Sequence, residues 1–81
     1  MFGRHERQTA KATIVAADLG TLHTSDMAAW DFVVDVQPTD GALFRAVTSS
    51  SFATSGKVPR AGDVVNVSFI SKALDDVRLE L

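Results

Sequence analysis

The residues that could bind a metal ion are few in this chain and lie far apart in the sequence. Of the two histidines, His5 lies in a polar N-terminal stretch, and His23 shares a Ser/Thr-rich segment with Asp26. A catalytic metal usually needs about three protein ligands, and no third candidate stands near His23 and Asp26. The chain also lacks cysteine, which excludes thiolate ligands and disulfides. We therefore expect neither a metal site nor a cofactor.

Serine and aspartate side chains are more numerous, but their placement does not suggest catalysis. No nucleophile-elbow pattern surrounds Ser49-Ser50-Ser51, although a catalytic serine needs a base and an orienting acid. General acid chemistry needs a carboxyl group with a raised pKa in a dry pocket. Asp75 and Asp76 lie in an expected turn, and Asp31 and Asp35 lie on the wet face of an expected strand. We expect no catalytic residue and no enzymatic activity.

Contact with a single-stranded nucleic acid is the alternative function. It requires cations along a groove together with aromatic side chains on which bases stack. A phosphate-binding loop is excluded, because Gly62 is followed by Asp63 and not by the Lys-Ser/Thr pair of that motif. The net charge of −2 and the pI near 5.5 also oppose general phosphate binding. The candidate contacts are Arg45, Phe52, Lys57 and Arg60.

Docking to a protein partner, or weak self-association, is the function that the sequence favours. Val33, Leu43 and Val47 have outward parity if the opposite strand face forms the core. A contiguous exposed apolar patch is typical of an interface, whereas single exposed apolar residues are ordinary. Alternatively, a strongly coiled sheet buries some of these side chains on both faces. We predict a small binding or accessory module whose interface includes these three residues.

The element that must position these side chains is best defined between Trp30 and Gln37. Trp30, Phe32, Val34 and Val36 point one way, while most of the intervening residues are polar, which is the period of a strand with one wet face. Pro38-Thr39-Asp40-Gly41 then carries the residues of a tight turn. The pattern predicts a hairpin with a second strand over 42–48.

The remaining apolar alternation predicts three further strands, over 9–19, 64–70 and 77–81. The alanines of the first of these are also compatible with a helix, and residues 49–56 fit a bulge, a short strand or a connection. Five short strands, mainly antiparallel and in meander-like order, must close around their apolar faces as a barrel. The expected core is Ile14, Trp30, Phe32, Val34, Val36, Phe44, Val65, Val67, Phe69, Val77 and Leu79.

The length of 81 residues allows one domain. We expect residues 1–8 to form a flexible N-terminal arm and residues 9–81 to form the all-β barrel. No apolar run approaches the ~20 residues of a membrane span, and the start of the chain is polar. These features predict a cytoplasmic protein without a membrane span, provided that the chain is not a piece of a longer one.

The segment from Pro59 to Val67 combines a proline, the Gly62-Asp63 pair and alternating valines. Together with Ala12-Thr13-Ile14-Val15, the Val34–Gly41 hairpin and the closing Val77–Leu81 strand, it resembles small uncharacterised bacterial barrel domains, often actinobacterial, of the OB-type or SH3-like kind. The resemblance covers residues 10–81 and rests on turn and strand patterns. It implies a small five-stranded barrel and assigns no functional residue.

Overall fold

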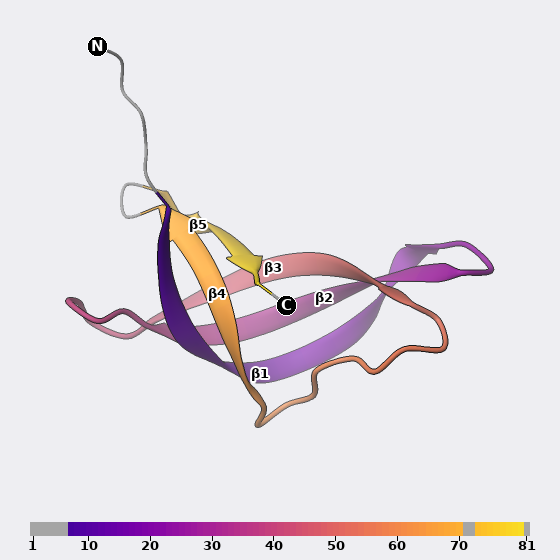
Figure 1. The fold of residues 1–81 in the computed structure, drawn as a ribbon, viewed down its shortest axis with the longest axis horizontal. Coiled ribbons are helices and arrows are strands. Elements are labelled where there is room, and N and C mark those ends of the chain that lie inside the picture. The colour runs from indigo at the N-terminus through magenta and orange to yellow at the C-terminus, as the bar shows by residue number, and fades with distance from the viewer. Residues whose placement is uncertain (1–6, 71–72, 81) are drawn as a thin grey trace, which may run out of the picture.

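The computed structural model describes residues 7–70 and 73–80, apart from the side chains of residues 22–23 and 73–75. It is an all-β fold, with no helix among the described residues, and it confirms the predicted five-stranded, antiparallel, nearly closed barrel (Figure 1). The strands are β1 Gln8–His23, β2 Met27–Gln37, β3 Phe44–Ala53, β4 Val64–Ile70 and β5 Ala73–Leu79.

The sheet is organised around β1, which is long enough to pair with two neighbours. Its first part, Gln8–Thr13, pairs with β4, and the stretch from Lys11 to His23 pairs with β2. The strand order is β3-β2-β1-β4-β5, so only the first three strands follow each other as a meander. The expected meander-like order is therefore wrong after β3, where residues 54–63 carry the chain to the other edge of β1 (Figure 1).

Two features of the strands turn this sheet into a barrel. The β1–β2 register shifts between Ile14 and Ala16, and such a bulge bends a strand and increases its twist. The far edges, β3 and β5, then approach each other, and the hydroxyl of Thr48 donates a 2.6 Å hydrogen bond to the carbonyl oxygen of Val77. Hydrogen-bonded ladders join the other neighbouring strands, whereas the described part of β3 and β5 shows none between them.

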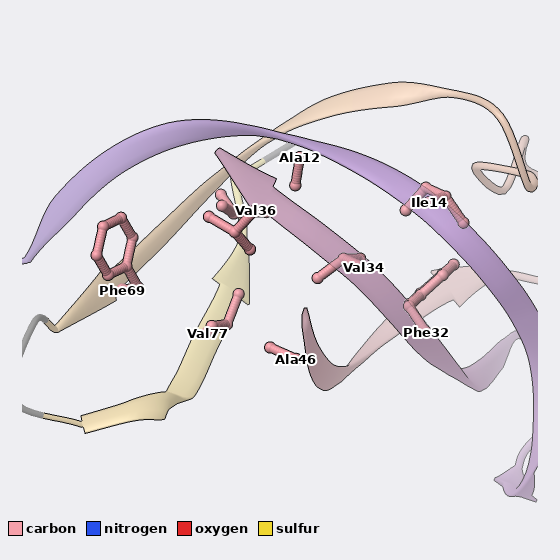
Figure 2. Packing of buried hydrophobic residues seen from close by; sticks show 9 residues of the cluster. Ala12, Ile14, Phe32, Val34, Val36, Ala46, Phe69 and Val77 are labelled. Carbon is pink, nitrogen blue, oxygen red and sulfur yellow. The ribbon is translucent and has the colours of Figure 1, made fainter. Parts of the chain in front are cut away.

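The core lies between the two halves of the curved sheet (Figure 2). Its largest fully buried side chains are those of Phe32, Ile14, Val34, Val36 and Val67. Edge-on ring pairs extend it, with centroids 5.9 Å apart for Phe32 and Phe52 and 5.4 Å apart for Phe44 and Phe69. The expected core residues Trp30, Phe44, Val65 and Leu79 are only partly buried and pack against its margin.

The strands extend further than the apolar pattern predicts. β1 continues beyond Leu19 to His23, and β3 continues through the serines to Ala53. The β2 strand explains the second extension, because Met27 pairs with Ala53 and Trp30 pairs with Ser50. Backbone pairing thus holds residues 49–53 in a strand despite their small polar side chains, which settles the open prediction for most of residues 49–56.

The expected N-terminal arm lies largely outside the described residues, which begin at Arg7. Arg7 donates hydrogen bonds to the hydroxyl and carbonyl oxygens of Ser68, both at 3.0 Å, and to the carbonyl of Asp76 at 3.2 Å. It also forms an ion pair of 3.3 Å with the Asp76 carboxylate. The Ser68 hydroxyl in turn donates to Glu80 at 2.6 Å. This cluster joins the start of β1 to β4 and β5.

Across the described part of the chain, no helix has the length and apolar character needed to cross a membrane.

Candidate functional site

A row of apolar side chains crosses the outer face of the three-stranded part of the sheet. Val33 on β2 lies directly opposite Val47 on β3 and, on its other side, opposite Ala16 on β1. We call Ala16, Val33 and Val47 the apolar row. Val47 is 64% exposed, Val33 and Ala16 are half-buried, and the bulged Val15 next to them is 36% exposed. The side chain of Val33 is thus shielded in part by its neighbours while Val47 faces solvent.

An ion pair borders the apolar row on one side. Asp35 on β2 lies opposite Arg45 on β3, and the guanidinium donates two hydrogen bonds of 2.8 and 3.1 Å to the two carboxylate oxygens. The bond from Arg45 holds the pKa of Asp35 below its ordinary value, and the carboxylate raises the pKa of Arg45. Arg45 is thereby committed to a neighbour on its own sheet.

Two carboxylates border the apolar row on the other side. Asp18 on β1 lies directly opposite Asp31 on β2, and Ser49 on β3 donates a 2.7 Å hydrogen bond to Asp31. Like charges at such positions repel each other. Within the described ranges, neither aspartate forms an ion pair with a cation. We call Asp18 and Asp31 the acidic pair.

The structure brings together two of the three predicted interface residues. Val33 and Val47 are cross-strand partners. Leu43 precedes β3 and is separated from Val47 along the chain by Arg45, which pairs with Asp35. Leu43 is 58% exposed, but no register position places it beside the apolar row.

A groove of about 1060 Å³ opens where residues 56–65 pass the end of the sheet. Four of its apolar side chains come from separate elements: Trp30 from β2, Phe52 from β3, Val65 from β4 and Val58 from the connection. All four are half-buried. The exposed residues Lys57 and Arg60 supply cations along the same groove. The lining of the groove therefore combines apolar side chains with two cations and the carboxylate of Asp63.

The chain segment that carries these cations is anchored to β1. The Asp63 carboxylate accepts a 2.9 Å hydrogen bond from the backbone N–H of Arg60. The backbone N–H of Gly62 donates a 2.8 Å hydrogen bond to the carbonyl oxygen of Ile14, and the backbone N–H of Ile14 donates another of 2.8 Å to the carbonyl oxygen of Asp63. Gly62 has a φ of 96°, which glycine adopts without the penalty that a side chain incurs. One local hydrogen bond and two backbone bonds to Ile14 therefore hold the end of this segment beside β1.

The predicted nucleic-acid contacts are divided between two surfaces. Phe52, Lys57 and Arg60 line the groove, whereas Arg45 belongs to the outer face with Asp35. Sequence reasoning missed the place of Trp30, because its alternation with Phe32 and Val34 pointed to the core. Trp30 does share their inward parity, but it pairs with Leu19 and Ser50 beyond the fully buried residues. The sequence pattern does not show how far β2 extends beyond the buried core, and that information is needed to place Trp30.

The described residues include no group of three histidine, cysteine, aspartate or glutamate side chains with the spacing of a metal site. The side chains of His5 and His23 lie outside the described part of the structure, so the predicted absence of a histidine site stays a prediction.

The fold and these surfaces define a small five-stranded, nearly closed antiparallel barrel with an apolar row on its outer face and a groove at one end. Comparisons with protein-family models, with curated proteins and with solved structures give no match.

Proposed function

We propose that this chain is a protein-docking module that binds a partner through the outer face of β1, β2 and β3. The observation that carries the proposal is the apolar row, with Val47 exposed and Val33 and Ala16 half-buried, between the Asp35–Arg45 ion pair and the acidic pair. A partner surface with apolar side chains at its centre and a lysine or arginine at its edge complements this face.

The charge of the partner follows from the acidic pair. Side chains directly opposite each other on neighbouring antiparallel strands have Cβ atoms about 4.5–5.5 Å apart, so Asp18 and Asp31 repel each other across the ladder. A cation placed between them relieves that repulsion and adds specificity to the contact. The Arg45 cation cannot take this role, because the apolar row separates it from the acidic pair.

The size of the contact also follows from the structure. A stable interface buries roughly 800 Å² on each partner, which is more than three small apolar side chains supply. The apolar row is therefore proposed as the centre of a wider contact that includes Val15, Ser49 and the acidic pair. Central residues contribute most of the binding energy in such interfaces, so Val47 is the residue to test first.

Within the barrel class, we propose the OB-type arrangement over the SH3-like one. The ladders and the β3–β5 approach give the circular order β1-β2-β3-β5-β4, with β4 on the far side of β1 from β2. A partly open five-stranded barrel with a crossing connection is the OB-type description. In an SH3-like barrel the third and fourth strands are neighbours, which they are not here. The cytoplasmic location and the bacterial origin of this chain stay predictions.

The docking proposal is tested by comparing proteins captured from a lysate of the source organism by the native chain and by its variants. Val47→Asp and Asp31→Lys alter the apolar row and the acidic pair, and Met27→Asp alters an apolar residue that is 42% exposed at the start of β2, outside both. Each variant is first checked for a native NMR spectrum. A captured protein is then purified, and its dissociation constant is measured with each variant.

The expected result is a direct complex that Val47→Asp and Asp31→Lys each weaken by about ten-fold or more, which corresponds to about 1.4 kcal/mol. Met27→Asp should leave the dissociation constant unchanged. Equal binding by all variants would place the contact elsewhere on the barrel. The nucleic-acid alternative concerns the groove and is tested with it below.

A further inference from the structure

The groove combines features that the outer face does not use. Trp30 and Phe52 are its two aromatic side chains, and Lys57 and Arg60 are its two cations. Neither cation forms an ion pair with an acidic side chain in the described structure. The one carboxylate of the groove, Asp63, is engaged by the backbone N–H of Arg60. Positive charge beside an apolar floor is thus available to a ligand.

The charge of the molecule decides which ligand suits this groove. Single-stranded nucleic acid carries a phosphate at every nucleotide, and proteins that bind it track the backbone with a run of cations. This chain has a net charge of −2, and only two cations line the groove, next to Asp63. A short peptide segment with one or two carboxylates requires no longer basic track.

We propose that the groove is a second docking site, which binds a partner segment that presents a large apolar side chain next to carboxylates. The apolar side chain lies on Trp30 and Phe52, and the carboxylates face Lys57 and Arg60. Gly56 and Ala61 are the small residues of the lining next to these cations.

The two docking sites lie on opposite faces of the same strands. Trp30 and Phe32 have inward parity on β2, whereas the alternating Asp31 and Val33 have outward parity. The groove and the outer face are therefore separately addressable by substitution, and occupation of one leaves the other accessible. The inference about the groove stands independently of the proposed function of the outer face.

Trp30 makes the groove directly observable, since it is the only tryptophan in the chain. The probe is an acetylated and amidated peptide with two carboxylates, Gly-Asp-Phe-Leu-Glu-Gly, titrated while the Trp30 emission is recorded. A peptide with Asn and Gln in place of the acids is the matched probe. The variants are the double substitution Lys57→Gln/Arg60→Gln and, as a control cation on β1 outside the groove, Lys11→Gln.

The acidic peptide should shift the Trp30 emission saturably in the native chain and in Lys11→Gln. The double variant and the neutral peptide should each bind about ten-fold more weakly, because each exposed ion pair contributes a few-fold to affinity. Val47→Asp should leave the titration unchanged, so a failure at the outer face and a failure at the groove give different patterns.

Two outcomes would overturn the inference. One is a failure of the peptide titration: either millimolar acidic peptide gives no saturable shift of the Trp30 emission, or the double variant gives the same shift as the native chain. The other is tighter binding of a dT oligomer than of the peptide. In that case the logarithm of the binding constant should fall with the logarithm of salt concentration with a slope of about −1.4, as two phosphate contacts on a single strand predict. That result would assign the groove to single-stranded nucleic acid.

Discussion

The hydroxyl of Thr48 on β3 donates a 2.6 Å hydrogen bond to the carbonyl oxygen of Val77 on β5. Both residues are buried, and their strands are the two edges of the sheet. A single side chain thus satisfies a buried backbone carbonyl at the junction where no ladder is described. This hydrogen bond therefore joins the two edges where the barrel closes.

Replacing Thr48 by valine should destabilise the protein by about 1–3 kcal/mol. The substitution keeps the shape of the side chain but leaves the Val77 carbonyl without its donor, and an unsatisfied buried polar group carries this cost. The measurement is urea unfolding. Thr13→Val on the exposed face of β1 is the control and should change the free energy of unfolding by less than about 0.5 kcal/mol. Equal effects of the two substitutions would show that the hydrogen bond does not stabilise the closure.

Phe32→Ala should destabilise the barrel more than Trp30→Ala. Phe32 is fully buried, so its truncation should cost about 3–5 kcal/mol, a large part of the roughly 4–12 kcal/mol expected for a domain of this length. Trp30 is half-buried beside the groove and loses less burial. Chemical denaturation followed by circular dichroism compares the two without relying on tryptophan emission. The opposite ranking would place Trp30 in the core.

The Asp35–Arg45 pair should make part of the stability depend on acid pH. The pKa of Asp35 is depressed in the folded state, so the pair stabilises the fold above the ordinary aspartate pKa of about 3.9. That contribution is lost as pH falls from this value through the lower, folded pKa. The stability difference between the native chain and Arg45→Gln should therefore be constant above about pH 5 and shrink below about pH 4.

Carbon-detected NMR titration of the Asp35 carboxyl group tests the cause of this pH dependence. Arg45→Gln should raise the pKa of Asp35 toward its ordinary value, since the hydrogen bond from Arg45 is the main cause of the depression. Arg60→Gln removes the same charge in the groove and should leave that pKa in place. An unchanged pKa in Arg45→Gln would mean that the pair does not form in solution.

Gly62→Ala should destabilise the fold although the added methyl group meets no atom within 4 Å. The cost comes from the φ of 96°, and a positive φ costs a residue with a Cβ atom about 1–2 kcal/mol. Gly41→Ala is the matched control, because its added methyl group makes only ordinary contacts of 3.5 and 3.6 Å with Pro38. Thermal unfolding of both variants separates the effect of backbone conformation from that of alanine itself. A neutral Gly62→Ala would show that this turn relaxes without cost.

The fold was predictable where side-chain alternation and turn residues agree. Phe32, Val34 and Val36 alternate with polar or half-buried neighbours and are all fully buried. The hairpin of β2 and β3 is confirmed. Its connection spans residues 38–43 and none of them has a positive φ, so the predicted tight turn and the start of the second strand at residue 42 are wrong. The Gln37 side chain donates hydrogen bonds to the carbonyl oxygens of Pro38 and Gly41, both at 3.1 Å. The alternation and the hairpin depend on contacts between residues close in sequence, so local reasoning is sufficient for them.

The strand order and the groove were not predictable, because both depend on contacts between distant segments. Nothing in residues 54–63 reveals that the next strand pairs with β1 and not with β3. The same crossing brings Lys57 and Arg60 to Trp30 and Phe52. The pair Val33–Val47 was predictable because the hairpin register fixes it, while the opposition of Asp18 and Asp31 depends on the register shift in β1.

The unequal bonding of the strands has a kinetic consequence for the backbone amides. Lys11, Ala12 and Thr13 of β1 have strand partners on both sides, whereas β3 has a ladder only toward β2. A backbone amide exchanges when the structure around it opens, and the free energy of that local opening differs from one part of the fold to another. The central residues of β1 should therefore exchange with deuterium most slowly, and the amides of β3 that face β5 should exchange first among the strands of the hairpin. We therefore expect local opening of the barrel to begin at the Thr48–Val77 junction, where one side-chain hydrogen bond joins the two edges of the sheet.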